Sequence, residues 1–128
     1  MTEPIFALIY GPSGIGKTTD CGYSFPRGLF VAAPGALQPI KSLCGYKPAR
    51  VEATSISAAT KLLANIDTER HDAFIVDDFS YLAELTFAKL EKRYNGFALW
   101  GKLRDVILEF RDAARYAKVH VILNCIGS

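Results

Sequence analysis

Apolar runs of strand length alternate with amphipathic segments along this chain. Five runs are predicted to be strands, at residues 5–10 (IFALIY), 29–33 (LFVAA), 50–53, 73–77 (AFIVD) and 119–126 (VHVILNCI). The first run is apolar almost throughout instead of alternating, which indicates a strand buried on both faces. Prolines and a glycine punctuate residues 36–49, so we expect a loop there, followed by a short edge strand at 50–53.

Four segments between these runs are predicted to be helices, at residues 17–24, 57–65, 80–94 and 98–117. Ser57 is the expected N-cap of the second helix, and Asn95-Gly96 separates the third from the fourth. The fourth has the clearest apolar stripe, with spacings of four and three, and it is widened by further apolar residues. The stripe comprises Leu99, Leu103, Val106, Phe110, Ala113 and Ala117, widened by Trp100, Ile107 and Ala114. Strands that alternate with helices predict an α/β domain with a mostly parallel sheet and helices on both faces.

Composition narrows the class of protein. A length of 128 residues predicts one domain, residues 1–128, and a hydrophobic share of 50% supplies one buried core. Because the net charge is only +2, the molecule as a whole does not attract nucleic acid, and any such site must be a local patch. Three scattered cysteines, no signal pattern and no apolar run of membrane length predict a cytoplasmic protein with reduced thiols and no membrane contact.

The strongest chemical signal is a phosphate-binding loop at residues 11–18. These residues match the pattern G-x-x-x-x-G-K-[ST] and follow directly on the first predicted strand. Glycines let successive backbone N–H groups converge on a phosphate, and the N-terminus of the next helix adds partial positive charge. We expect Lys17 to reach the β- and γ-phosphates and the Thr18 hydroxyl to hold Mg²⁺, whereas the alternative is an ordinary glycine-rich turn. The predicted nucleotide-binding residues are Gly11, Pro12, Ser13, Gly14, Ile15, Gly16, Lys17, Thr18 and Thr19.

A second motif ends the strand at 73–77 with two acids. An apolar strand that ends in Asp, about sixty residues after a phosphate-binding loop, is the Walker B pattern. Asp77 is therefore predicted to hold the magnesium through water, at the carboxyl end of its strand. Asp78 is a candidate to orient or deprotonate the attacking water. An equally good interpretation makes Asp78 the N-cap or a first-turn acid of the following helix.

Asn124 is a polar residue near the end of the last apolar strand. A buried amide is costly unless it is hydrogen-bonded, so we expect it to have a partner. In a nucleotide hydrolase that partner is the attacking water or the γ-phosphate. The alternative is an end-of-strand residue that belongs to a turn.

Basic and aromatic residues gather around the Asn95-Gly96 break. Arg93, Tyr94 and Phe97 are candidates to contact single-stranded nucleic acid by charge and stacking. The interpretation that we favour from the sequence is that Phe97 and Trp100 belong to the core. The mixed charges on the fourth helix are typical of a solvated face.

Three stretches together resemble the RecA-like branch of P-loop ATPases: FALIYGPSGIGKTT, FIVDDFSYLAE and LWGKLRDVILEFRDAARYAKVHVILN. The resemblance is closest to small phage-encoded ATPases that assist single-strand annealing and recombination. It implies that the Asn124 strand lies between the loop strand and the Asp77 strand. It also implies ATP as the nucleotide, Lys17 and Thr18 on phosphate and magnesium, and Asn124 as the γ-phosphate sensor. A DNA-contacting loop is implied at residues 91–98.

The chain departs from the RecA-like pattern in two places. The catalytic Glu expected after the second strand is replaced by Ala-Ala-Pro-Gly at residues 32–35, which shifts water activation to Asp78 or leaves hydrolysis weak. The further C-terminal strands and a second DNA loop are missing, so we expect a truncated form or one that a partner subunit completes. Such ATPases commonly work between subunits, with an arginine supplied in trans, for which Arg93, Arg111 and Arg115 are available.

These observations predict an ATP-binding protein, a Mg²⁺-dependent ATPase of phage DNA recombination or replication in the host cytoplasm. Its expected partners are nucleotide, single-stranded DNA and a second copy or partner subunit. Lys17, Asp78 and Asn124 are the predicted catalytic residues. One alternative is a nucleotide-gated DNA-binding or assembly module with little turnover, and another is a small P-loop nucleoside or nucleotide kinase.

Overall fold

The computed structural model describes residues 4–11, 27–32 and 49–126. Each predicted strand in these ranges is present, with bounds within one residue of those expected. The elements are β1 (Phe6–Gly11), β2 (Leu29–Ala32), β3 (Ala49–Glu52), α2 (Ile56–Ala64), β4 (Ala73–Asp77), α3 (Phe79–Glu91), α4 (Gly96–Arg115) and β5 (His120–Ile126). The predicted helix at 17–24 lies outside the described residues.

The five described strands form one parallel sheet in the order β1-β5-β4-β2-β3. The central strand β4 is buried along its whole length, which explains why its sequence is apolar without alternation. β3 lies at an edge and is largely exposed, as predicted for residues 50–53. β5 lies between β1 and β4, which is the order that the resemblance implied.

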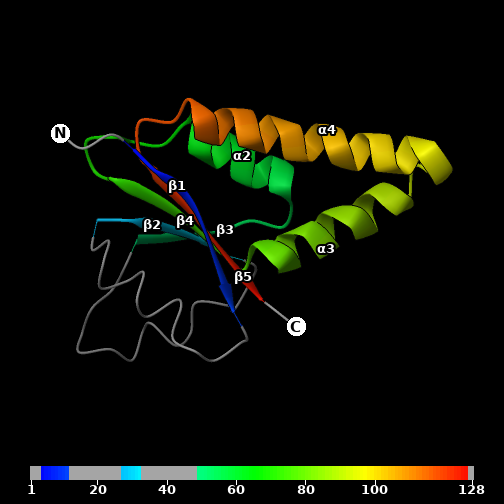
Figure 1. Ribbon diagram of the computed structural model, residues 1–128, viewed down its shortest axis with the longest axis horizontal. Coiled ribbons are helices and arrows are strands. Elements are labelled where there is room, and N and C mark those ends of the chain that lie inside the picture. Colours follow the sequence, from blue (N-terminus) through cyan, green and yellow to red (C-terminus); the bar gives the residue numbers. More distant parts are fainter. Residues whose placement is uncertain (1–3, 12–26, 33–48, 127–128) are drawn as a thin grey trace.

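The three described helices pack on one face of the sheet (Figure 1). Alternate residues of the strands meet them there, and the other residues form a second apolar cluster on the opposite face. The cluster under the helices includes Val31, Phe74, Val76, Val121 and Leu123. The opposite cluster comprises Phe30, Ala32, Ala73, Ile75 and Ile122. The structure is thus an α/β domain in which the described helices all cover the first of these faces.

The N-cap of α2 is Ser55, so the prediction of Ser57 was wrong. The Ser55 hydroxyl accepts a hydrogen bond from the Ala58 backbone N–H at 3.1 Å. The reason is a contact from another helix: the buried Thr86 hydroxyl of α3 accepts the Ile56 N–H at 2.9 Å. That bond satisfies one of the free N–H groups in the first turn. The helix can therefore begin at Ile56, two residues before the start that a Ser57 N-cap implies.

The core interpretation of Phe97 and Trp100 was also wrong. Phe97 is 97% exposed and Trp100 is 60% exposed, whereas Phe110 and Ala114 on the same helix are buried. The C-terminal half of α4 packs over the sheet and α2, but its first turns extend past the sheet beside the end of α3 (Figure 1), where Trp100 contacts Phe87. The apolar residues of α4 keep their helical spacing beyond the edge of the sheet, where there is no core surface for them to pack on.

Substitution by alanine at two glycines of α4 should change the stability of the protein in opposite directions. Gly96, at the start of the helix, has a φ of +56° and Gly101 is inside the helix, and a Cβ on either would meet no atom within 4 Å. Gly101→Ala should raise the free energy of unfolding by about 0.5–1 kcal/mol, because alanine has the higher helix propensity. Gly96→Ala should lower it by about 1–2 kcal/mol, because an L side chain is strained in the left-handed region. Urea unfolding of both variants measures this, and equal effects of the same sign would contradict it.

Candidate functional site

The carboxyl ends of three neighbouring strands meet at one edge of the sheet. β1, β5 and β4 are parallel and adjacent, so their C-terminal residues lie side by side there. Gly11, the first residue of the loop motif, ends β1 and pairs with Ile126 of β5. Asp77 ends β4 and pairs with Asn124 of β5. Ligands of open α/β sheets bind at this kind of edge, outside the carboxyl ends of the strands.

Asp77 and Asn124 are the buried polar residues at this edge. Asp77 is 8% exposed and Asn124 is 0% exposed. Ile75 and Ile122, two residues earlier on each strand, belong to the cluster opposite the described helices. Because side chains alternate along a strand, Asp77 and Asn124 point to that same face. Polar side chains are buried at a cost, so the pair marks a polar site within an otherwise apolar sheet.

The pair also lies close to the start of the loop motif. Asn124 is two residues before Ile126, the register partner of Gly11. At about 3.3 Å per residue, this places the Asn124 Cα about 7 Å along the sheet from the level of Gly11. The structure therefore brings together Asp77, Asn124 and the first residue of the predicted loop. The rest of that loop, Pro12 to Thr19 with Lys17 and Thr18, lies outside the described residues.

Asp78 caps α3, as one of the two sequence interpretations predicted. Its Oδ1 accepts the Ser80 backbone N–H at 2.9 Å, and its backbone is extended, with φ −108° and ψ 129°. The peptide bond between Asp77 and Asp78 is cis. The capping bond holds one carboxylate oxygen against the helix and leaves the other to accept a further donor. A role for Asp78 in orienting water stays a prediction.

On its other side Asp77 is flanked by an apolar residue. Val31 of β2 pairs with Val76 of β4, so Ala32 is level with Asp77. Ala32 is buried and belongs to the apolar cluster. The last residue of β2 therefore offers no carboxylate to the site. In the RecA-like pattern a Glu follows this strand.

Sequence reasoning missed one acid on the same row of the sheet. Glu52, the last residue of β3, pairs with Ala32 and is exposed. Neighbouring strands are about 4.8 Å apart, so the Cα atoms of Glu52 and Asp77 are about 10 Å apart, with both side chains on one face. The only signal in the sequence is that an acid ends a short strand. It could not indicate the register that aligns Glu52 with Asp77.

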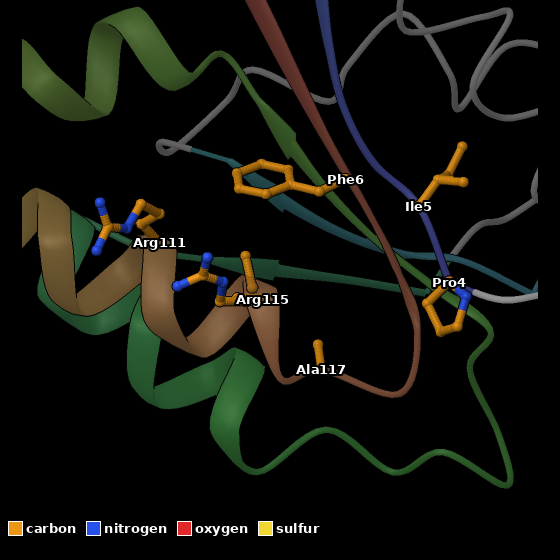
Figure 2. A pocket seen from close by; sticks show the side chains of 7 residues that line it. Pro4, Ile5, Phe6, Arg111, Arg115 and Ala117 are labelled. Atoms are coloured by element: carbon orange, nitrogen blue, oxygen red, sulfur yellow. The ribbon is translucent and has the colours of Figure 1, made fainter.

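A shallow cavity of about 510 Å³ lies at the opposite, amino-terminal edge of the sheet (Figure 2). It is formed by the start of β1 and the end of α4, where Arg111 and Arg115 project beside Phe6. The Arg111 guanidinium also contacts the Asp112 carboxylate at 3.3 Å. Two of the three arginines suggested for action in trans are thus at the edge away from Asp77. The third, Arg93, follows α3 at its far end.

No family model matches this sequence, and comparison with curated proteins finds no match. Across residues 4–11, 27–32 and 49–126, no helix has the length and apolarity to span a bilayer. Within the same ranges, His, Cys, Asp and Glu side chains form no group of three or more that would hold a metal ion.

Proposed function

We propose that this chain is a RecA-like P-loop domain that binds ATP with Mg²⁺ and hydrolyses it slowly. The observation that carries the proposal is the meeting of Gly11, Asp77 and Asn124 at the carboxyl edge of adjacent strands β1, β4 and β5. A phosphate-binding loop must begin at such a strand end, and its magnesium must be within reach of an acid on a neighbouring strand. The resemblance supports adenine as the base and a role in phage DNA recombination or replication.

Each site residue has a defined part in this proposal. Lys17 and the loop backbone hold the β- and γ-phosphates, and the Thr18 hydroxyl is a magnesium ligand. Asp77 holds the hydrated metal, which fits a donor set of one buried carboxylate because Mg²⁺ keeps several waters and takes its other ligands from phosphates. Bound Mg²⁺ neutralises charge that develops on the γ-phosphoryl group. Asn124 lies level with Asp77, and in this proposal its amide hydrogen-bonds the γ-phosphate or the attacking water.

A binding module with little turnover is the second candidate. The observation that favours it is that the residues level with Asp77 on the two neighbouring strands, Ala32 and Asn124, carry no carboxylate. Ala32 occupies the β2 side, and one oxygen of Asp78 is engaged in the cap of α3. Nucleotide then acts as a switch that changes affinity for a partner, and hydrolysis only resets it.

Titration of the wild-type protein with ATP, ADP and AMP, each with and without Mg²⁺, tests nucleotide binding. We expect affinity to rise from AMP to ATP, because the loop binds the β- and γ-phosphates, and to rise again with Mg²⁺ for ATP. Equal affinity for AMP and ATP would overturn the proposal. Single-turnover hydrolysis, with and without single-stranded DNA, then separates the ATPase from the binding module.

Asp78→Asn should keep the fold and lower turnover several-fold. Asparagine is as good an N-cap as aspartate, so the melting temperature should stay close to wild type. An amide is a much weaker base than a carboxylate, so hydrolysis should fall while ATP affinity is unchanged. Glu52→Gln is the matched control, since it neutralises the exposed acid on the same row. Loss of turnover in Glu52→Gln but not in Asp78→Asn would assign water activation to Glu52.

A further inference from the structure

α4 carries a second row of residues, which faces away from the core. Five exposed residues follow one another along the helix at spacings of three and four: Phe97, Trp100, Arg104, Ile107 and Arg111. Because an α-helix has 3.6 residues per turn, these spacings keep all five on one side, where they extend over about 20 Å. We call this row the exposed stripe. The buried residues Leu99 and Phe110 belong to the neighbouring side of the helix, which faces the core.

Three members of the exposed stripe are large apolar residues. Ile107 is 40% exposed, and the two aromatic residues are more exposed still. Trp100 is held against Phe87 of α3, with ring centroids 5.4 Å apart, so its ring has a fixed place on the surface. Single apolar residues are common on protein surfaces, but a row at spacings of three and four is the pattern with which one helix packs against another. The exposed stripe therefore has the pattern of a helix-packing surface.

The start of β1 adds a second apolar surface. Phe6 and Leu8 pair with Val121 and Leu123 of β5, so their side chains are on the face of the sheet that carries the described helices. Val121 and Leu123 are buried there, whereas Phe6 is 47% exposed and Leu8 is 59% exposed. The described helices thus cover β5 and leave this face of β1 largely open.

The shallow cavity at the amino-terminal edge of the sheet joins the two surfaces. Phe6 of β1 lines it together with Arg111 and Arg115 of α4, and the three side chains lie near one another in Figure 2. From the cavity, β1 leads to Leu8 in the direction of the carboxyl edge. α4 ends at the cavity, so Ile107, one turn before Arg111, lies in the same direction. An apolar surface therefore extends from the cavity along both elements.

Charges on α4 are divided between two sides of the helix. Arg104 and Arg111 belong to the exposed stripe, and Arg115, one turn further, continues it at the cavity. A separate row contains the acids Asp105, Glu109 and Asp112. The Arg111 guanidinium contacts the Asp112 carboxylate at 3.3 Å, but both side chains are more than half exposed, and such a pair is weak enough for another carboxylate to replace it. The exposed stripe is therefore apolar and positively charged.

We propose that the exposed stripe and the open face of β1 form a docking surface for an acidic amphipathic helix of a partner protein. That helix lies beside α4 and over β1, with its apolar residues on Trp100, Ile107 and Phe6. Its carboxylates bind the guanidinium groups of Arg104 and Arg111, since a guanidinium and a carboxylate match in bidentate geometry. The arginines select an acidic partner and exclude a basic one. The proposal does not depend on the nucleotide site, which lies at strand ends.

Charge distinguishes this partner from a second copy of the chain. Arg104 is the central residue of the exposed stripe, so two stripes packed on each other along their full length place arginine against arginine, whether the helices are parallel or antiparallel. Like charges in contact oppose such packing. An acidic helix meets the same apolar residues without this conflict.

Anisotropy of a fluorescein-labelled synthetic peptide measures docking on the whole chain. The peptide has about four heptads, with leucine at positions a and d, glutamate at e and g, and no tryptophan. One control peptide carries lysine at e and g, and another carries serine at a and d. We expect the acidic leucine peptide to bind roughly tenfold more tightly than either control, or better, because apolar packing and charge both contribute.

Reversal of charge on the protein tests the two arginines. Arg104→Glu/Arg111→Glu should bind the acidic leucine peptide roughly tenfold more weakly and the lysine peptide more tightly than wild type does. Misfolding cannot imitate this gain of binding. Lys61→Glu/Arg70→Glu is the matched control, because it reverses two exposed cations that are not on α4 and should keep the preference of wild type.

Trp100 locates the peptide directly, because it is the only tryptophan in the chain. Docking should shift its emission to shorter wavelength, since the exposed part of the ring leaves water. Phe97→Ala loses little packing within the protein and should weaken binding, whereas Tyr116→Ala removes an exposed ring outside the stripe and should not. Lys17→Ala should bind the peptide as wild type does, which separates this surface from the nucleotide site.

Three results would overturn the proposal: no binding of the acidic leucine peptide by wild type, an unchanged preference in Arg104→Glu/Arg111→Glu, and binding without a shift of Trp100 emission. Two further measurements identify rival occupants. Self-association in sedimentation velocity that Phe97→Ala abolishes, with no peptide binding, would make the stripe a contact between copies of this chain. Binding of an oligothymidylate of about 20 nucleotides in place of the peptide would assign the arginines to phosphates.

Discussion

Lys17→Ala is expected to weaken binding of Mg²⁺–ATP by roughly ten- to a hundredfold. A hydrogen bond to a charged group contributes about 1.5–3 kcal/mol, and each 1.4 kcal/mol is a factor of ten in affinity. In the motif G-x-x-x-x-G-K-[ST], the lysine is the cation that reaches the β- and γ-phosphates. The loss should therefore be large for ATP, smaller for ADP and negligible for AMP. This graded pattern identifies the contact with the terminal phosphates.

Calorimetric titration and thermal unfolding of the same variant separate ligand binding from folding. The melting temperature without ligand should stay close to wild type, because the charge serves the ligand. Lys118→Ala is the control with the same change of charge, since Lys118 is exposed beyond the end of α4. ATP affinity within twofold of wild type in Lys17→Ala would reject the phosphate-binding loop.

The central strands could be placed from the sequence because burial on both faces leaves an unbroken apolar run. β1 was placed as well, but the expectation that both of its faces are buried was wrong, because it lies at an edge of the described sheet and its Phe6 and Leu8 are exposed. β4 lies at residues 73–77, as predicted, since its five residues are all buried and an acid ends it. Helix starts were less accurate. Both Ser55 and Ser57 can cap a helix, and the choice depends on Thr86, which accepts the Ile56 N–H from another helix. A local pattern does not contain that contact.

The candidate site, too, was predictable from the sequence only in part. Acids and amides at strand ends could be predicted to meet at one edge, and Asp77 and Asn124 do lie level with each other. Glu52 could not be found, because its place on the row depends on the register between β3 and β2. Exposure of Phe97 and Trp100 could not be foreseen either. The apolar stripe of α4 is longer than the sheet surface on which it packs, and the extent of the sheet is a property of the whole fold.

Asp77→Asn should remove the effect of Mg²⁺ on ATP affinity. The side chain keeps its size in the buried position at the end of β4, so packing beside Asn124 is maintained. What is lost is the negative charge that holds the hydrated cation through charge-assisted hydrogen bonds, about 1.5–3 kcal/mol. Affinity for ATP without Mg²⁺ should be unchanged or slightly higher, because a carboxylate no longer lies near the phosphates.

The measurement is a pair of ATP titrations, one with Mg²⁺ and one with a chelator, for wild type, Asp77→Asn and Asp105→Asn. Asp105 is exposed on α4, so its variant carries the same change of charge away from the strand ends and should retain the full magnesium effect. We expect a ratio of the two affinities of roughly ten or more in wild type and about one in Asp77→Asn. A ratio in Asp77→Asn equal to that of wild type would mean that another carboxylate holds the metal. Glu52 and Asp78 are the next to exchange, because they are the other acids that end or follow strands at this edge of the sheet.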